Sequence, residues 1–111
     1  VLIEGEITHA VRKTPSAGEW RVQIEFGGRY ALEAPGARER EIAMRAVEAL
    51  TVDETPLYAR VDLVEVAGMG PAVIEAELIE PELFFPMSAE AAEVMGRALA
   101  RRLGVQLGSR A

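Results

Sequence analysis

The sequence has no cysteine, which excludes a disulfide framework and a zinc site built from thiolates. No apolar run approaches the roughly 20 residues that span a bilayer, and no signal peptide opens the chain, so we expect a cytoplasmic protein without a membrane partner. Basic residues are also scarce, with 12 against 18 acidic ones and a formal net charge of -6. Proteins that bind nucleic acid normally need a basic face to displace counterions from phosphates, so this balance argues against a nucleic-acid partner.

The length of the chain sets the domain organisation. With 111 residues, of which 50% are hydrophobic, it can bury one modest core, so we expect a single folded unit. The sequence starts at Val1 in what already resembles a strand, without a methionine or a preceding loop. We therefore expect a fragment of a larger protein, in which residues 1–104 fold and residues 105–111 form a tail.

Short apolar segments separated by turn residues predict strands in the first part of the chain. Residues Val1–Ile3 and Ile7–Val11 are expected to form a hairpin, because Gly5 between them permits a tight turn. Apolar and polar residues then alternate over 20–26, the period of a half-buried strand. Residues 30–33 are expected to form a short extended link.

The second part of the chain adds two helices and a pair of strands. Apolar residues recur at helical spacing over 38–50, and again from the N-cap Ser88 to Gly104. Between these helices, Leu57–Val66 and Ala72–Ile79 are expected to be strands joined by a glycine-rich turn. This order predicts an α+β fold, an antiparallel sheet with two helices packed on one face.

Three acidic residues interrupt the apolar pattern of the last two strands: Asp62 in the first, Glu75 and Glu77 in the second. A carboxylate that faces a protein interior is costly unless a cation compensates its charge. Side chains alternate along a strand, so Glu75 and Glu77 project from the same face and repel each other unless a cation lies between them. Magnesium prefers oxygen ligands, so the trio suggests a divalent metal site. On pattern alone, the solvated face of an amphipathic strand is the commoner explanation.

Several segments together resemble one family. They are Gly5–Lys13 (GEITHAVRK), Glu19–Gly28 (EWRVQIEFGG), Tyr58–Val64 (YARVDLV) and Glu77–Pro81 (ELIEP). They resemble the C-terminal half of the ATP-grasp fold found in carboxylate-amine ligases of the glutathione synthetase-like type, near the branch of the cycloserine-pathway ligase. In that superfamily an Asp on one strand and a Glu-x-Asn on the next hold the magnesium ions of ATP.

The resemblance implies metal-binding roles for Asp62, Glu75 and Glu77, with Mg²⁺ or Mn²⁺ as the metal and ATP as the nucleotide. Glu77 takes the place of the family's Asn, and this departure puts the number of metal ions in question. Arg60 lies two residues before Asp62 on the same strand face, where it is expected to be a salt-bridge partner rather than a phosphate ligand.

Two basic residues and one apolar residue complete the implied site. Arg21 resembles an arginine of the family, with Lys13 as a basic residue before it, and both would stabilise charge on the transferred phosphoryl group. Lys13 would also contact the nucleotide, although a surface cation is an almost equally good explanation for it. Ile74 would lie under the adenine, which requires a bulge because strict alternation points it away from Glu75.

The resemblance implies that the intact protein is an enzyme. It would activate a small carboxylate as an acyl phosphate with ATP and join it to an amine. The remaining ATP-grasp domains would lie upstream, so we expect the isolated chain to be nearly inert and to bind nucleotide weakly or not at all. Apolar surface left open for those domains predicts self-association as a homo-oligomer.

Two rival functions come from other classes. A non-catalytic ATP-grasp-like domain would keep the fold for binding or assembly. A metal-dependent nuclease with an Asp and a Glu-x-Lys would need a lysine in place of Glu77 and a basic surface, and the chain has neither. His9, the single histidine, alternates with Ile7 and Val11 and is expected to be a packed strand residue rather than a catalytic base.

Overall fold

The computed structural model describes residues 1–18, 28–51 and 53–108 of the chain. Its strands are β1 (Leu2–Ile3), β2 (Glu6–Ile7), β3 (Ala10–Thr14), β4 (Arg29–Glu33), β5 (Tyr58–Val66) and β6 (Gly70–Glu77). Its helices are α1 (Ala37–Leu50), the short 3-10 helix η2 (Phe85–Met87) and α2 (Ala89–Leu103). The strand expected over 20–26, which includes Arg21, lies outside the described residues.

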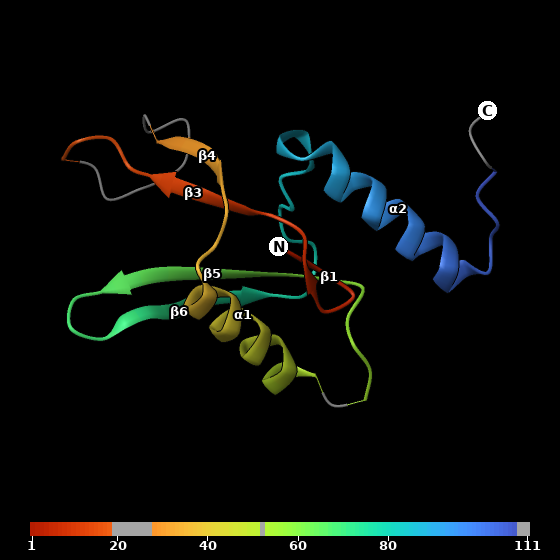
Figure 1. Ribbon diagram of the computed structural model, residues 1–111, viewed down its shortest axis with the longest axis horizontal. Helices are drawn as coiled ribbons and strands as arrows, with labels where there is room; N and C mark the ends of the chain where they lie inside the picture. Colours follow the sequence, from red (N-terminus) through yellow and green to blue (C-terminus); the bar gives the residue numbers. More distant parts are fainter. Residues whose placement is uncertain (19–27, 52, 109–111) are drawn as a thin grey trace.

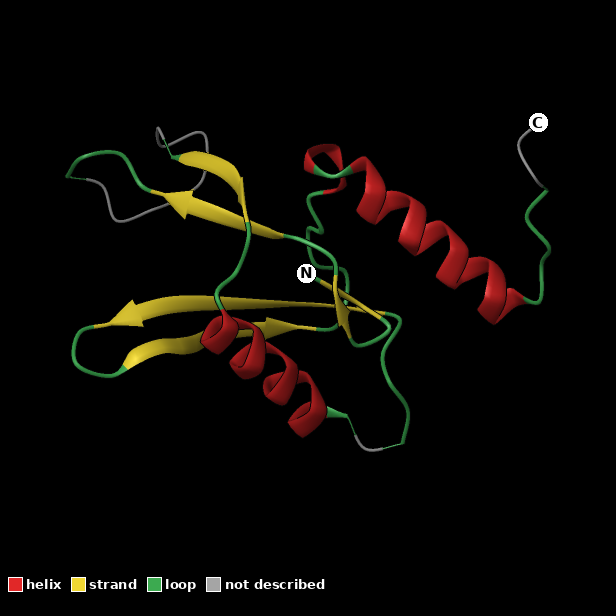
Figure 2. Ribbon diagram, viewed as in Figure 1, coloured by secondary structure: helices red, strands yellow, loops and turns green. Residues whose placement is uncertain are grey.

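The described strands form two antiparallel sheets. One has four strands in the order β2-β1-β5-β6, and the other contains only β3 and β4. All described pairings are antiparallel, and two α-helices accompany them, so the expected α+β class is confirmed (Figure 2). None of the helices in the described ranges combines the length and the apolar character needed to cross a membrane.

The hairpin expected at the start of the chain is confirmed. Leu2 pairs with Ile7 and Ile3 with Glu6, so Glu4 and Gly5 form a two-residue turn. Both turn residues have positive φ, 49° and 81°, the combination required by the turn type that matches the twist of two-residue hairpins. A glycine is favoured at the second position because it has no Cβ to clash in this conformation.

The boundaries of the next elements differ from the expectation. The strand expected over Ile7–Val11 is divided into β2 and β3, because the chain turns at Thr8 and His9 so that the His9 ring enters the interior. His9 is 6% exposed there, and its Nε2 lies 2.8 Å from the carbonyl oxygen of Leu83. The extended link expected over residues 30–33 is strand β4, which pairs with β3 along its whole length.

The core lies between α1 and one face of the four-stranded sheet. Leu2, Val47 and Ala59 form its buried centre, and Val61 and Leu78 are among the residues packed against it. Figure 1 shows α1 along one side of the β5–β6 hairpin and the β3–β4 hairpin on the other side. Since Ala59 and Val61 face the core, the alternating residues of β5 project towards the β3–β4 side.

Helix α2 begins and ends where the sequence predicts. The Ser88 Oγ accepts a hydrogen bond from the N–H of Ala91, and Gly104 adopts a left-handed conformation that ends the helix. The helix lies beside η2 and β1, on the side of the molecule away from α1 (Figure 1). Arg101 and Arg102 both bind the Glu4 carboxylate, at 2.6 and 3.1 Å, so an ion-paired cluster joins the end of α2 to the β1–β2 turn.

Candidate functional site

The three predicted metal ligands lie together on the β5–β6 hairpin. Asp62 pairs with Glu75 in the strand register, and Arg60 pairs with Glu77. The four side chains share the face of the hairpin opposite the core, because Val61 and Ala76 are the paired residues that alternate with them. The strand register therefore places Asp62 across from Glu75 and on the same face as Glu77.

A single guanidinium group binds all three carboxylates. The Arg60 Nε donates to Asp62 Oδ1 at 2.9 Å, and its Nη2 donates to Oδ2 at 3.2 Å. The same Nη2 lies 3.5 Å from a Glu77 oxygen and 3.6 Å from a Glu75 oxygen. The Arg60 side chain is only 12% exposed. The expected salt bridge with Asp62 is therefore a partly buried, bidentate ion pair rather than an exposed surface pair.

The second cation of the cluster comes from the other hairpin. The Lys13 Nζ on β3 lies 3.5 Å from Asp62 Oδ2, with 24% of its side chain exposed. The contact brings together two residues that are 49 positions apart in the sequence. Lys13 thus lies at the carboxylate cluster, and its role toward phosphate stays a prediction; Arg21 lies outside the described residues.

The cluster carries more negative than positive charge. Asp62, Glu75 and Glu77 face two cations, Arg60 and Lys13, which leaves one carboxylate in excess. A hydrogen bond shared with Glu77 and charge repulsion from it raise the pKa of Glu75, and the nearby Arg60 opposes this shift only in part. The raised pKa of Glu75 reflects the excess of negative charge at this position, where a further positive charge would be favourable.

The residues fit a divalent cation in their chemistry but not in their present spacing. Three carboxylates are hard oxygen donors of the kind that Mg²⁺ prefers, and one of them is under-compensated. Their spacing in this structure is set by Arg60, and within the described ranges no group of three or more His, Cys, Asp or Glu side chains is arranged to hold a metal ion. A metal ion would therefore have to take over contacts that the guanidinium makes here.

The predicted bulge is present beside the cluster. The register changes between Asp62, which pairs with Glu75, and Leu63, which pairs with Val73, so Ile74 has no partner on β5. Such an extra residue bends the strand and re-aims its side chain. Ile74 is 66% exposed at this bulge, and its contact with adenine stays a prediction.

The segment that follows β6 also contacts the cluster, which the sequence did not reveal. The Arg60 Nη1 donates to the carbonyl oxygen of Glu82 at 3.3 Å, and the Glu82 carboxylate accepts the N–H of Phe84 at 2.9 Å. The Phe84 ring lies under the Lys13 Nζ, 5.3 Å from it. The sequence signal was the pair of phenylalanines after Pro81, but nothing in its pattern says which one faces Lys13.

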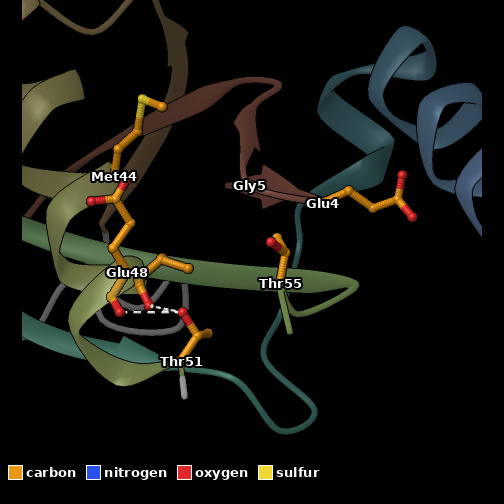
Figure 3. Close-up of a pocket in the computed structure, with 7 residues that line it drawn as sticks. Glu4, Gly5, Met44, Glu48, Thr51 and Thr55 are labelled. Atoms are coloured by element: carbon orange, nitrogen blue, oxygen red, sulfur yellow. Dashed lines mark hydrogen bonds between the residues drawn. The ribbon is translucent and has the colours of Figure 1, made fainter. Parts of the chain in front are cut away.

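A separate pocket lies away from this cluster, between α1 and the β1–β2 turn (Figure 3). It has a volume of about 210 Å³. It is lined by Glu4, Gly5, Met44, Val47, Glu48, Thr51 and Thr55. The Glu4 carboxylate is bound to the α2 arginines, and the Thr51 hydroxyl donates to the carbonyls of Val47 and Glu48. The Glu4 and Thr51 side chains are thus paired with the protein itself, and the lining residues include no cation for a phosphate.

Comparison with known proteins supports the fold. The sequence matches no protein-family model and no curated protein. Among solved structures, the crystal structure of D-cycloserine synthetase DcsG is similar, with a TM-score of 0.76 and 30% sequence identity. The match covers 92% of this chain and 36% of that protein, so the chain spans about a third of its length. This likeness supports the expected ATP-grasp-like fold and a general relationship to that synthetase.

Proposed function

We propose that this chain is part of an ATP-dependent carboxylate-amine ligase. The whole protein would activate a small carboxylate as an acyl phosphate and join it to an amine. Residues 1–104 would be the C-terminal ATP-grasp subdomain and supply the acidic strands that bind the metal-nucleotide complex. The observation that carries the proposal is the convergence of three carboxylates and two cations on one face of a hairpin, in a fold similar to that of a D-cycloserine synthetase.

Asp62, Glu75 and Glu77 would hold Mg²⁺ or Mn²⁺, which would bridge the protein to the phosphates of ATP and neutralise part of their charge. Arg60 would keep Asp62 in place through its two hydrogen bonds. Its contact with Glu82 links the carboxylates to the segment that follows β6.

Lys13 and Arg21 would offset the charge that builds up on the transferred phosphoryl group. Lys13 supports this role by its position, because its ammonium already lies on the carboxylate cluster. The proposed role of Arg21 rests on the family resemblance alone. Ile74, exposed at the bulge, would contact the adenine.

The other partners follow from the same proposal. The chain would work in the cytoplasm together with upstream ATP-grasp domains that complete the nucleotide clamp. Apolar side chains near the end of β6 are strongly exposed, including Ile79 at 84% and Ile74 at 66%. Without the upstream domains, this surface favours self-association of the isolated chain.

The test is ATP turnover by the protein that contains this chain, with Mg²⁺ and a panel of carboxylates and amines. Glu75→Ala should lower turnover at least about tenfold, since it removes a metal ligand. Glu65→Ala, an exposed carboxylate on the same hairpin outside the cluster, should leave turnover unchanged. Turnover that survives Glu75→Ala would instead favour the alternative, a non-catalytic ATP-grasp-like domain for binding or assembly.

Calorimetry on the 111-residue chain gives a second test. Half of a nucleotide clamp positions ATP poorly, so the chain alone should bind Mg-ATP weakly or not at all. Tight binding of Mg-ATP by the chain alone would contradict the proposal that upstream domains are needed to complete the nucleotide site.

A further inference from the structure

Phe84 has an unusual backbone conformation for a residue with a bulky side chain. Its φ is 55° and its ψ is 34°, in the left-handed region that residues with a Cβ adopt only at a cost. Such strain persists where surrounding contacts fix it, and it is common at functional sites.

Contacts from three directions hold Phe84. The Glu82 carboxylate accepts its N–H at 2.9 Å, and its carbonyl oxygen accepts the N–H of Met87 at 3.0 Å. Tyr30 on β4 packs edge-on against its ring, with centroids 5.6 Å apart and planes at 83°. These contacts turn the ring towards the β3–β4 hairpin, whereas the ring of the next residue, Phe85, lies 6.4 Å from His9.

The fixed ring supports Lys13. The Lys13 Nζ lies 5.3 Å from the centroid of Phe84, within cation-π range, and 3.5 Å from Asp62 Oδ2. Asp62 is bound by Arg60, and Arg60 donates to the backbone of Glu82, which in turn holds Phe84. The five residues form a closed ring of contacts.

We propose that Phe84 is a positioning residue, whose strained backbone and ring face hold the Lys13 ammonium over the carboxylate cluster. A lysine side chain has four rotatable carbon–carbon bonds and would otherwise sample many positions. The role in turnover rests on the proposed ligase function, whereas the contact itself can be tested without it.

The contact can be read directly because Lys13 is the only lysine of the chain. Lysine labelled with ¹³C and ¹⁵N therefore gives one set of side-chain NMR signals. In the native chain the Lys13 Hε signals should be shifted upfield by the Phe84 ring current. Phe84→Leu should return them to the free-lysine position, Phe84→Tyr should keep them shifted, and the matched control Phe85→Leu should leave them unchanged. Free-lysine shifts in the native chain would overturn the proposal.

Turnover by the protein that contains this chain then tests the consequence. Phe84→Leu should lower kcat/KM about fivefold, the size expected for loss of one cation-π contact. In a Lys13→Met background the same change should have no further effect, because Phe84 acts through Lys13. Equal losses in both backgrounds would contradict positioning and indicate a merely structural role. A Lys13→Met protein with full turnover would refute the role of Lys13 in the proposed function. The contact between Lys13 and Phe84 would still be decided by the NMR experiment.

Discussion

Replacing Arg60 by methionine tests what holds the carboxylate cluster together. Methionine keeps an unbranched stem of similar reach but removes the guanidinium. Asp62, Glu75 and Glu77 then face one another with only Lys13 nearby as a cation. The change therefore removes the charge at the centre of the cluster with little loss of apolar packing.

The size of the effect follows from the contacts of Arg60. It makes two charge-assisted hydrogen bonds to Asp62, at 2.9 and 3.2 Å, and a longer one to the Glu82 backbone. Each such bond contributes about 1.5–3 kcal/mol when its geometry is good. The Asp62 side chain is 18% exposed, so water replaces part of what is lost. We expect the free energy of unfolding to fall by about 3 kcal/mol, near the lower bound for breaking a buried ion pair.

Thermal unfolding in metal-free buffer measures this loss. For a domain of about this size, 3 kcal/mol corresponds to a drop in Tm of about 12–24 °C. The control is Arg12→Met, which breaks the exposed pair between Arg12 and Glu33 on the β3–β4 hairpin and should lower Tm far less. An Arg60→Met chain as stable as the native one would refute the central role of the guanidinium.

The same variant tests whether the carboxylates can hold a metal ion. With the guanidinium gone, Mg²⁺ should raise the Tm of Arg60→Met more than that of the native chain, because the ion replaces the missing charge. At 100 times its dissociation constant a ligand adds about 2.7 kcal/mol of stability. If millimolar Mg²⁺ shifts the Tm of neither protein, the metal assignment of the three carboxylates fails for the isolated chain.

Three further predictions concern the scaffold. Leu2→Ala, at a fully buried core position, should lower the free energy of unfolding in urea by about 2–5 kcal/mol. Gly5→Ala should cost about 1–2 kcal/mol in the same assay, because φ there is 81° and the new Cβ would lie 3.1 Å from a neighbouring methyl group. Hydrogen bonds from Arg101 and Arg102 lower the pKa of Glu4 below its ordinary value of 4.5, so this ion pair stabilises the fold above that pH and is lost as the pH falls through the lowered pKa. The stability difference between native chain and Glu4→Gln should therefore vanish in acid, and a difference that stays constant with pH would contradict the ion pair.

The local rules of secondary structure accounted for most of the fold. The β1–β2 turn follows from a glycine between two apolar pairs, and α2 from a serine N-cap and a glycine C-cap. The alternation of apolar residues along β5 and β6 placed the carboxylates on one face. These features depend on neighbours in sequence, which is why the pattern alone predicts them.

The features that the sequence did not predict depend on distant contacts. The break between β2 and β3 occurs because His9 turns inward to reach Leu83, 74 residues away. Burial lowers the pKa of His9 and favours its neutral form, which suits the packed role expected for it. The left-handed conformation of Phe84 likewise has a distant contact, the ring of Tyr30, in addition to its local contacts with Glu82 and the turn into η2.

Glu77 stands where the ATP-grasp pattern described above has an asparagine, and this difference has a physical consequence. An asparagine there would be neutral, whereas Glu77 raises the pKa of Glu75 and lies across the strand pair from Arg60, 3.5 Å from its guanidinium. The added carboxylate thus gives Arg60 a partner and leaves Glu75 short of positive charge. A divalent ion at this cluster would relieve that shortage, but it would have to compete with the Arg60 guanidinium for the same carboxylates.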